Sequence, residues 1–124
     1  MRKIKTGIKI ETFIYNFITD GGTINVPIRT GIILPIGTRL TQIHFANIVN
    51  FASAGNLATL DVTIGAMAIT FTAAIDIARL NGSRNVNPEM TFTTAVGELI
   101  IIPRVEDITA GQGVFYCPYF EARI

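Results

Sequence analysis

Histidine and cysteine, two residue types that often perform catalysis, each occur once in this sequence. The single histidine, His44, could act as a general base, and the single cysteine, Cys117, could act as a nucleophile if a nearby base lowered its pKa. No partner group stands at a recognisable spacing from either residue. We therefore interpret His44 as a strand residue at a surface or interface, and Cys117 as a small buried hydrophobic residue.

Metal and phosphate sites are equally poorly supported. One histidine and one cysteine cannot supply a conventional zinc site, and the carboxylates lack the spacing of a calcium loop. We interpret the adjacent pair Glu106-Asp107 as a solvated turn. Gly111-Gln112-Gly113 is too short for a phosphate-binding loop, and we interpret it as a hairpin turn. The sequence thus predicts no catalytic residue, no metal site, no cofactor and no enzymatic activity.

Basic residues gather near the N-terminus and suggest binding rather than catalysis. They are Arg2, Lys3, Lys5 and Lys9. Such a cluster could form an arm that contacts nucleic acid or an acidic protein surface, or it could merely solvate the end of the chain. The net charge of +1 argues against a general nucleic-acid binder, so we expect no specific nucleic-acid partner.

Aromatic residues near the C-terminus raise the possibility of a sugar-stacking platform. They are Phe115, Tyr116, Tyr119 and Phe120. Because alternate residues of a strand point to opposite faces, these rings divide between two faces. Core packing combined with an interface is the simpler interpretation.

The composition indicates a chain that is covered by partners. Charged residues make up 15%, against about 25% in a typical soluble domain, and hydrophobic residues make up 49%. No apolar run reaches the length of a transmembrane helix, so we expect no membrane partner. We predict a homo-oligomer, because too few charges are available to keep the apolar surface of a monomer in water.

The sequence predicts an all-β fold. Isoleucine occurs 21 times and threonine 15 times, and both are β-branched. Short alternating segments are separated by turns that we place at 20–22, 34–38, 53–56, 81–82 and 109–113. About eight strands with short connections predict an antiparallel β-sandwich, jelly-roll-like in form. The segment 72–80 could be either a short helix or a strand.

The N-terminal segment is the predicted docking element. We divide the chain into a docking strand or arm, residues 1–22, and a β-sandwich domain, residues 23–124. The second half of the first strand is apolar on both faces, so it should be buried on both sides. The expected interface comprises Ile10, Phe13, Ile14, Tyr15, Phe17 and Ile18. Docking would occur by strand addition or by apolar burial. Phe13→Asp should then abolish assembly while leaving a folded domain.

The order of several short motifs resembles that of small virion proteins of tailed bacteriophages. The motifs are Ile33-Leu34-Pro35-Ile36-Gly37-Thr38, Ala58-Thr59-Leu60-Asp61-Val62-Thr63-Ile64-Gly65, Gly97-Glu98-Leu99-Ile100-Ile101 and Thr109-Ala110-Gly111-Gln112-Gly113. The resemblance extends from about Val26 to Tyr119, while Ala66 to Leu80 departs from it by being richer in alanine. It implies a β-sandwich that serves as a head decoration protein, head fibre or tail accessory, and trimers are frequent among such proteins.

We therefore expect a non-enzymatic bacteriophage virion protein, assembled in the host cytoplasm, that binds the major capsid protein or other virion proteins as well as copies of itself. The alternative is a carbohydrate- or receptor-binding module at a fibre tip, for which the loop Asn81 to Glu89 would be the binding region. Two further alternatives are an enzyme with a cleft of paired titratable groups and a β-barrel carrier for a lipid.

Overall fold

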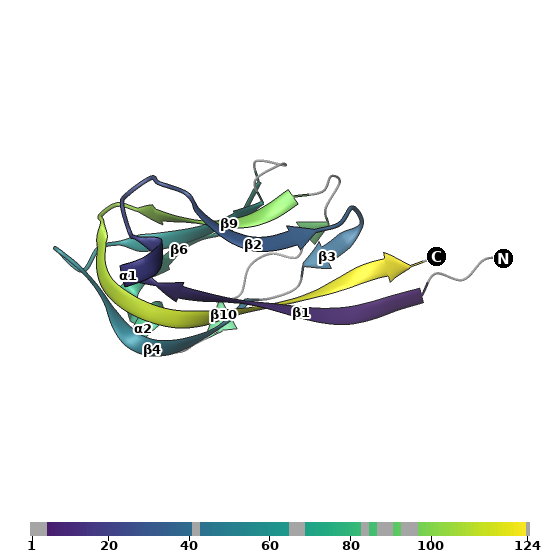
Figure 1. The fold of residues 1–124 in the computed structure, drawn as a ribbon, viewed down its shortest axis with the longest axis horizontal. Coiled ribbons are helices and arrows are strands. Elements are labelled where there is room, and N and C mark those ends of the chain that lie inside the picture. Colours follow the sequence, from purple (N-terminus) through teal and green to yellow (C-terminus); the bar gives the residue numbers. More distant parts are fainter. Residues whose placement is uncertain are drawn as a thin grey trace.

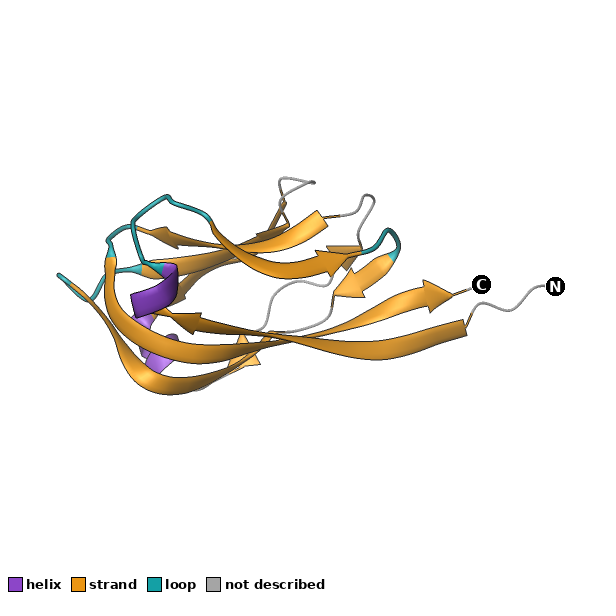
Figure 2. Ribbon diagram, viewed as in Figure 1, coloured by secondary structure: helices purple, strands orange, loops and turns teal. Residues whose placement is uncertain are grey.

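The computed structural model describes residues 5–40, 43–64, 69–82, 85–86, 91–92 and 97–123. Figures 1 and 2 show two layers of strands, with two short helices at one end and, at the other, the start of β1 and the end of β10. The elements are β1 (Lys5–Asn16), α1 (Phe17–Asp20), β2 (Ile28–Leu34), β3 (Thr38–Leu40), β4 (Ile43–Ser53), β5 (Thr59–Ile64), β6 (Ile69–Asp76), α2 (Ile77–Asn81), β7 (Asn85–Val86), β8 (Thr91–Phe92), β9 (Gly97–Arg104) and β10 (Ile108–Arg123).

The strands form an eight-stranded jelly roll if β3 and β4 count as one interrupted strand and β7 and β8 as another. The first sheet, sheet A, then has the order β1, β10, β3/β4, β7/β8, and the second, sheet B, has the order β2, β9, β5, β6. All pairs are antiparallel. Successive strands cross from one sheet to the other, except that β5 and β6 pair as neighbours within sheet B, and this is the connectivity of a jelly roll. This confirms the predicted fold class.

The core lies between the two sheets and follows from the alternation along their strands. In β5 and β9 every second residue is buried, and the residues between them are partly exposed. A chain of aromatic rings fills the end near the helices. The centroid distances are 5.5 Å from Tyr15 to Phe51, 5.7 Å from Phe51 to Phe45, and 4.7 Å from Phe45 to Phe115. Such separations are favourable for aromatic pairs.

The glycines of 109–113 lie inside β10, so the predicted hairpin turn at 109–113 was wrong. A Cβ atom on Gly111 would collide with the ring of Phe51, and one on Gly113 would collide with the ring of Phe45. These glycines therefore make room for the aromatic core rather than for a reversal of the chain. The chain turns earlier, where Val105 has φ +73° and Glu106 donates its N–H to the carbonyl of Arg104 at 2.9 Å.

Two other segments differ in part from the sequence interpretation. The segment 72–80 is neither all helix nor all strand, because β6 runs to Asp76 and α2 then begins, capped by the Asp76 carboxylate, which accepts the N–H of Arg79 at 2.8 Å. The chain does not enter a strand directly after the turn that we placed at 20–22, because β2 begins only at Ile28. Asn25 has φ +64°, a conformation that interrupts a strand, and Val26 is exposed.

The predicted N-terminal docking segment is part of the sandwich. All twelve residues of β1 pair with β10 in one continuous register, from Lys5 opposite Arg123 to Asn16 opposite Gln112. Structurally, β1 therefore belongs to the same sheet as the rest of sheet A. A docking role for β1 remains a prediction.

Candidate assembly interface

An apolar stripe runs along β1 and β10 on the side of sheet A that faces away from the core. We call it the outer face, and it consists of the outward side chains of β1 and β10. Its members are Ile8, Ile10, Thr12, Ile14, Val114, Tyr116, Pro118 and Phe120. The strand register sets Ile14 opposite Val114 and Ile10 opposite Pro118, so the apolar residues form cross-strand pairs. Ile8, Ile10 and Ile14 are 65%, 63% and 57% exposed, although isoleucine is among the residues most often buried.

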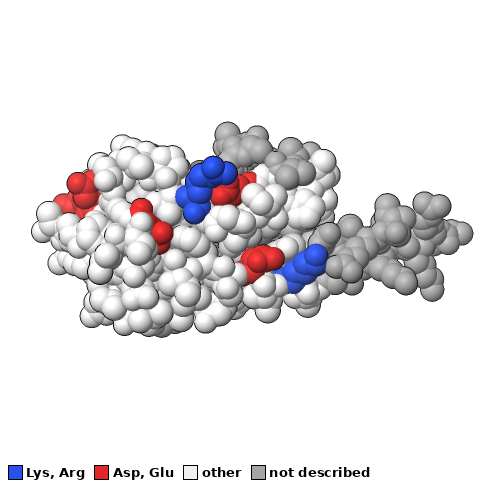
Figure 3. Space-filling view, viewed as in Figure 1, with Lys and Arg blue, Asp and Glu red and all other residues white. Residues whose placement is uncertain are grey.

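None of these eight side chains carries a charge. Lys9 and Glu11 have the opposite parity and point to the other side of the strand. Arg39, opposite Phe120 on β3, is the basic residue beside the stripe. Charged side chains are also sparse on the described surface seen in Figure 3. An uncharged, isoleucine-rich sheet surface is typical of a protein–protein contact.

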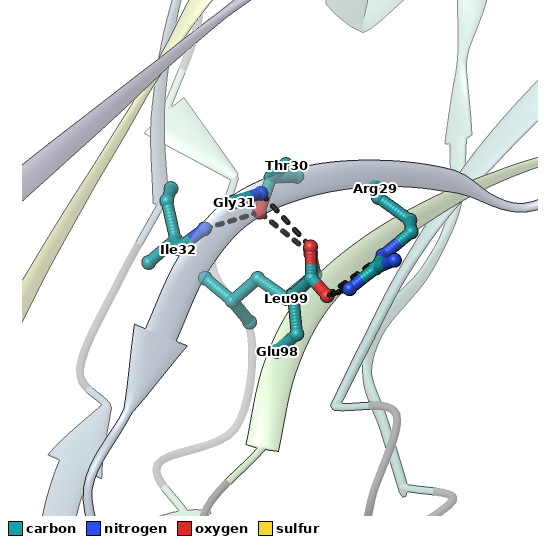
Figure 4. Close-up of polar contacts among 6 residues, drawn as sticks. All are labelled: Arg29, Thr30, Gly31, Ile32, Glu98 and Leu99. Carbon is teal, nitrogen blue, oxygen red and sulfur yellow. Dashed lines mark hydrogen bonds and ion pairs between the residues drawn. The ribbon is translucent and has the colours of Figure 1, made fainter.

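The outward side of sheet B is built differently. On β2 and β9, the Arg29 guanidinium pairs with the Glu98 carboxylate at 2.8 Å, and Gly31 donates its N–H to the same carboxylate at 2.9 Å (Figure 4). Thr30, a partly buried residue between Arg29 and Gly31, donates its hydroxyl to the Leu99 carbonyl at 2.6 Å and so ties β2 to β9. The Arg29 and Gly31 hydrogen bonds stabilise the charged form, so they hold the pKa of Glu98 below its usual value.

A second ion pair lies further along sheet B. The Arg104 guanidinium approaches the Asp61 carboxylate at 3.3 Å and also donates to the Asn25 side-chain oxygen at 2.7 Å. Thr59 and Thr63 flank Asp61 on β5. This side of the sandwich therefore presents the charged and hydroxyl groups that suit a surface in water.

The structure divides the six predicted interface residues between the core and the surface. Tyr15 is fully buried and donates its hydroxyl to the Gly21 carbonyl at 2.5 Å, while Phe13 and Phe17 pack against the core. Ile10, Ile14 and Ile18 are exposed; Ile10 and Ile14 belong to the outer face, and Ile18 belongs to α1. Because Phe13 packs against the core, Phe13→Asp would disturb folding, so it cannot isolate an effect on assembly.

The sequence interpretation missed part of this surface. Ile8, Val114, Pro118 and Phe120 also point outward. The detectable signal was the alternation along each strand. Ile8 lies on the same face of β1 as Ile10 and Ile14, and Val114, Pro118 and Phe120 lie on one face of β10. This signal could not be used alone, because the second half of β1 is apolar on both faces and only the pairing with β10 shows which face meets the core.

The residues considered for catalysis lie apart. His44 is partly exposed on β4, opposite Tyr116. Cys117 is buried, and burial, with a smaller contribution from the charge of Glu11, raises the pKa of its thiol to about 12. The thiol is therefore protonated at neutral pH, as expected of a buried structural cysteine.

The pair Glu106-Asp107 fastens loops together. The Glu106 carboxylate accepts the N–H of Leu57 at 2.9 Å, the hydroxyl of Ser53 at 2.8 Å and the N–H of Gly55. These bonds lower the pKa of Glu106, with the Leu57 bond contributing most. Asp107 accepts the N–H of Ile24 at 2.7 Å. The pair is thus a structural clamp rather than a merely solvated turn.

Several other sequence predictions meet the limits of the described residues. Most of the loop Asn81 to Glu89, and the basic residues Arg2 and Lys3, lie outside them. Within the described residues, no group of three or more histidine, cysteine or carboxylate side chains could hold a metal ion. No helix in this part of the chain has the length and apolar character needed to cross a membrane.

Comparison with known proteins finds similarity at the level of fold. No family model matches the sequence, and no curated protein matches it. A chain in the acid-stable capsid structure of Helicobacter pylori bacteriophage KHP30 superimposes with a TM-score of 0.65 at 13% sequence identity. The match covers 96% of this chain and 94% of that one, so the two chains share the whole fold and are similar in length.

Proposed function

We propose that this protein is a non-enzymatic structural component of a bacteriophage virion and that it binds its neighbours through the outer face of sheet A. The observation that carries the proposal is the uncharged stripe on β1 and β10, whose isoleucines are more than half exposed. The full-length similarity of fold to a chain from a bacteriophage capsid structure supports the virion setting.

The outer face would act by apolar burial. Covering isoleucine side chains that are now in water contributes roughly 25 cal/mol for each Å² of apolar surface removed from solvent. The cross-strand pairs give this surface a fixed shape, because both strands are held in a continuous twelve-residue register. A preorganised surface loses little conformational entropy when it binds.

The position of the protein in the particle is part of the proposal. We propose that it associates with the major capsid protein or another virion protein as a decoration, head-fibre or tail accessory component, and that it also associates with copies of itself. Trimers are frequent among the proteins that the sequence resembles. The outer face would be covered by the virion protein to which the component is attached.

The experiment is a binding measurement with a matched pair of variants. Ile14→Asp places a charge on the outer face, whereas Ile33→Asp places one on β2 of sheet B at a residue of similar exposure, 53% against 57%. Particles of the phage that encodes the chain should contain it, and should incorporate Ile33→Asp but not Ile14→Asp. Mass spectrometry of gradient-purified particles reads out both results. Absence of the wild-type chain from the particles, or equal incorporation of both variants, would contradict the proposal.

A further inference from the structure

The edges of the two sheets differ in how well they are protected against pairing with another chain. On sheet B, β2 contains a register shift between Arg29 and Ile33, and β6 pairs with β5 through two irregularities. On sheet A, the short strands β7 and β8 have two residues each. Bulges and short edge strands are the usual means by which proteins prevent strands from adding to a sheet.

The edge formed by β1 has none of these protections. Within the described part of the chain β10 is the strand that pairs with β1, so the opposite side of β1 is a sheet edge. The strand is twelve residues long, contains no proline and shows no register shift against β10. A long, regular edge is a template for one more antiparallel strand.

The order of charges along β1 selects the strand that fits there. Lys9 and Glu11 are the sequence neighbours of Ile10, and both point to the face of the strand opposite that of Ile10. In an antiparallel pair of identical strands related by a two-fold axis at Ile10, Lys9 of each copy lies opposite Glu11 of the other. With the axis at Lys9 two lysines would be opposed, and with the axis at Glu11 two glutamates would be opposed. Opposite charges across strands are favourable, and like charges are unfavourable.

We infer that β1 pairs edge to edge with β1 of a second copy of this chain, antiparallel and about a two-fold axis at Ile10. The contact is isologous, so each favourable pair occurs twice. Ile8 lies opposite Thr12 of the second copy, and Thr6 lies opposite Ile14. Sheet A becomes continuous through both copies, and the two outer faces join into one broader apolar surface.

A lysine on an edge strand can also serve to repel other strands. Charge exchange separates that role from the proposed pairing. Lys9→Glu and Glu11→Lys should each weaken the dimer by about tenfold or more, because two attractive pairs become repulsive. The double variant Lys9→Glu with Glu11→Lys should restore it. Sedimentation equilibrium of the full chain measures all four proteins. A monomeric or trimeric wild type, or a double variant as weak as the single ones, would overturn the inference.

Disulfide trapping tests the register and does not depend on those variants. Ile10→Cys places a thiol opposite itself across the axis, within the Cα separation of about 4.4–6.8 Å that a disulfide spans. Ile14→Cys, at a site of nearly equal exposure, should not cross-link, because its two copies lie about 27 Å apart along the strands. The native Cys117 is buried and is present in both variants. Equal cross-linking of the two variants under mild oxidation would overturn the register.

The edge and the outer face are different surfaces, so the two proposals can fail separately. A chain that dimerises but is absent from particles would keep the pairing and remove the virion role. A chain that enters particles as a monomer would do the reverse.

Discussion

The outer face of β1 and β10 and the outward side of sheet B differ in charge, although the same chain forms both. Sheet B presents Arg29 with Glu98 and Arg104 with Asp61, and Thr59 and Thr63 flank Asp61. The corresponding surface of β1 and β10 presents isoleucine, valine, proline and aromatic side chains without a charge. The difference indicates which side of the sandwich is suited to water and which to another protein. Among the residues that the structure describes, the outer face is therefore a surface without charge.

The largest effect should come from making the outer face resemble sheet B. In the double variant Ile8→Lys with Ile14→Lys, two exposed isoleucines become charged, and binding to capsids assembled without the chain should weaken by roughly 30-fold or more. Co-sedimentation measures the binding, and Ile33→Lys on sheet B is the control. Binding that survives the double change would remove the distinction between the two surfaces.

The next effect contrasts the inner and outer sides of sheet A. Tyr15→Phe removes the buried hydroxyl that donates to Gly21 and should lower the free energy of unfolding by about 1 kcal/mol. Tyr116→Phe, on the outer face, should change it little. Urea unfolding measures both variants. Equal losses would show that Tyr15 is less integral to the fold than its burial indicates.

Tyr15 also predicts a dependence of stability on alkaline pH. Burial, assisted by the charge of Asp20, raises the pKa of Tyr15 in the folded protein above that in the unfolded chain. Its contribution is therefore complete below the unfolded value, about 10, and declines as the pH rises above it. Tyr15→Phe should remove this part of the alkaline loss, as measured by urea unfolding between pH 8 and pH 11 (roughly the range around that pKa). An unchanged profile would contradict the assignment.

A smaller effect is expected on sheet B. Arg104→Ala breaks the partly exposed pair with Asp61 and should cost about 0.2–1 kcal/mol of stability. It should leave assembly unaffected, because it lies away from the outer face. Thermal unfolding and co-sedimentation together test this. Loss of particle binding in Arg104→Ala would show that sheet B contributes to the contact, which contradicts the assignment of binding to the outer face.

The smallest effect is a change in how steeply the free energy of unfolding falls at acidic pH. The folded-state pKa of Glu98 is lowered, so its contribution is present above the unfolded value, about 4.3, and is lost as the pH falls through the folded value. Glu98→Gln should make this fall in stability at acidic pH slightly less steep, with no effect on assembly. Urea unfolding at neutral and acidic pH measures the difference, and an identical fall in both proteins would contradict it.

Local patterns were sufficient to predict the architecture. The alternation in Thr59–Ile64 and the turn before Thr38 both appear in the structure, where Thr38 donates its hydroxyl to the Pro35 carbonyl at 2.8 Å. The prediction of a turn at 109–113 was wrong because glycine occurs both in turns and at strand positions where another side chain packs closely against the backbone. At Gly113 it allows the ring of Phe45 to approach, a contact between distant parts of the chain that no local pattern reveals.

The candidate interface was predictable only in part, for a related reason. Ile14 and Tyr15 are adjacent apolar residues, and alternation places them on opposite faces without showing which face is buried. Pairing with β10 decides it, because Tyr15 and Phe115 then point into the same aromatic core. The exposed face is consequently the isoleucine face.

The most direct test of the central claim is oxidative footprinting of side chains in the free protein and in the assembled particle. Ile8, Ile14, Tyr116 and Phe120 should be labelled in the free protein and protected after assembly, while Ile33 should be labelled equally in both. Protection of Ile33 together with continued labelling of the outer face would contradict the account.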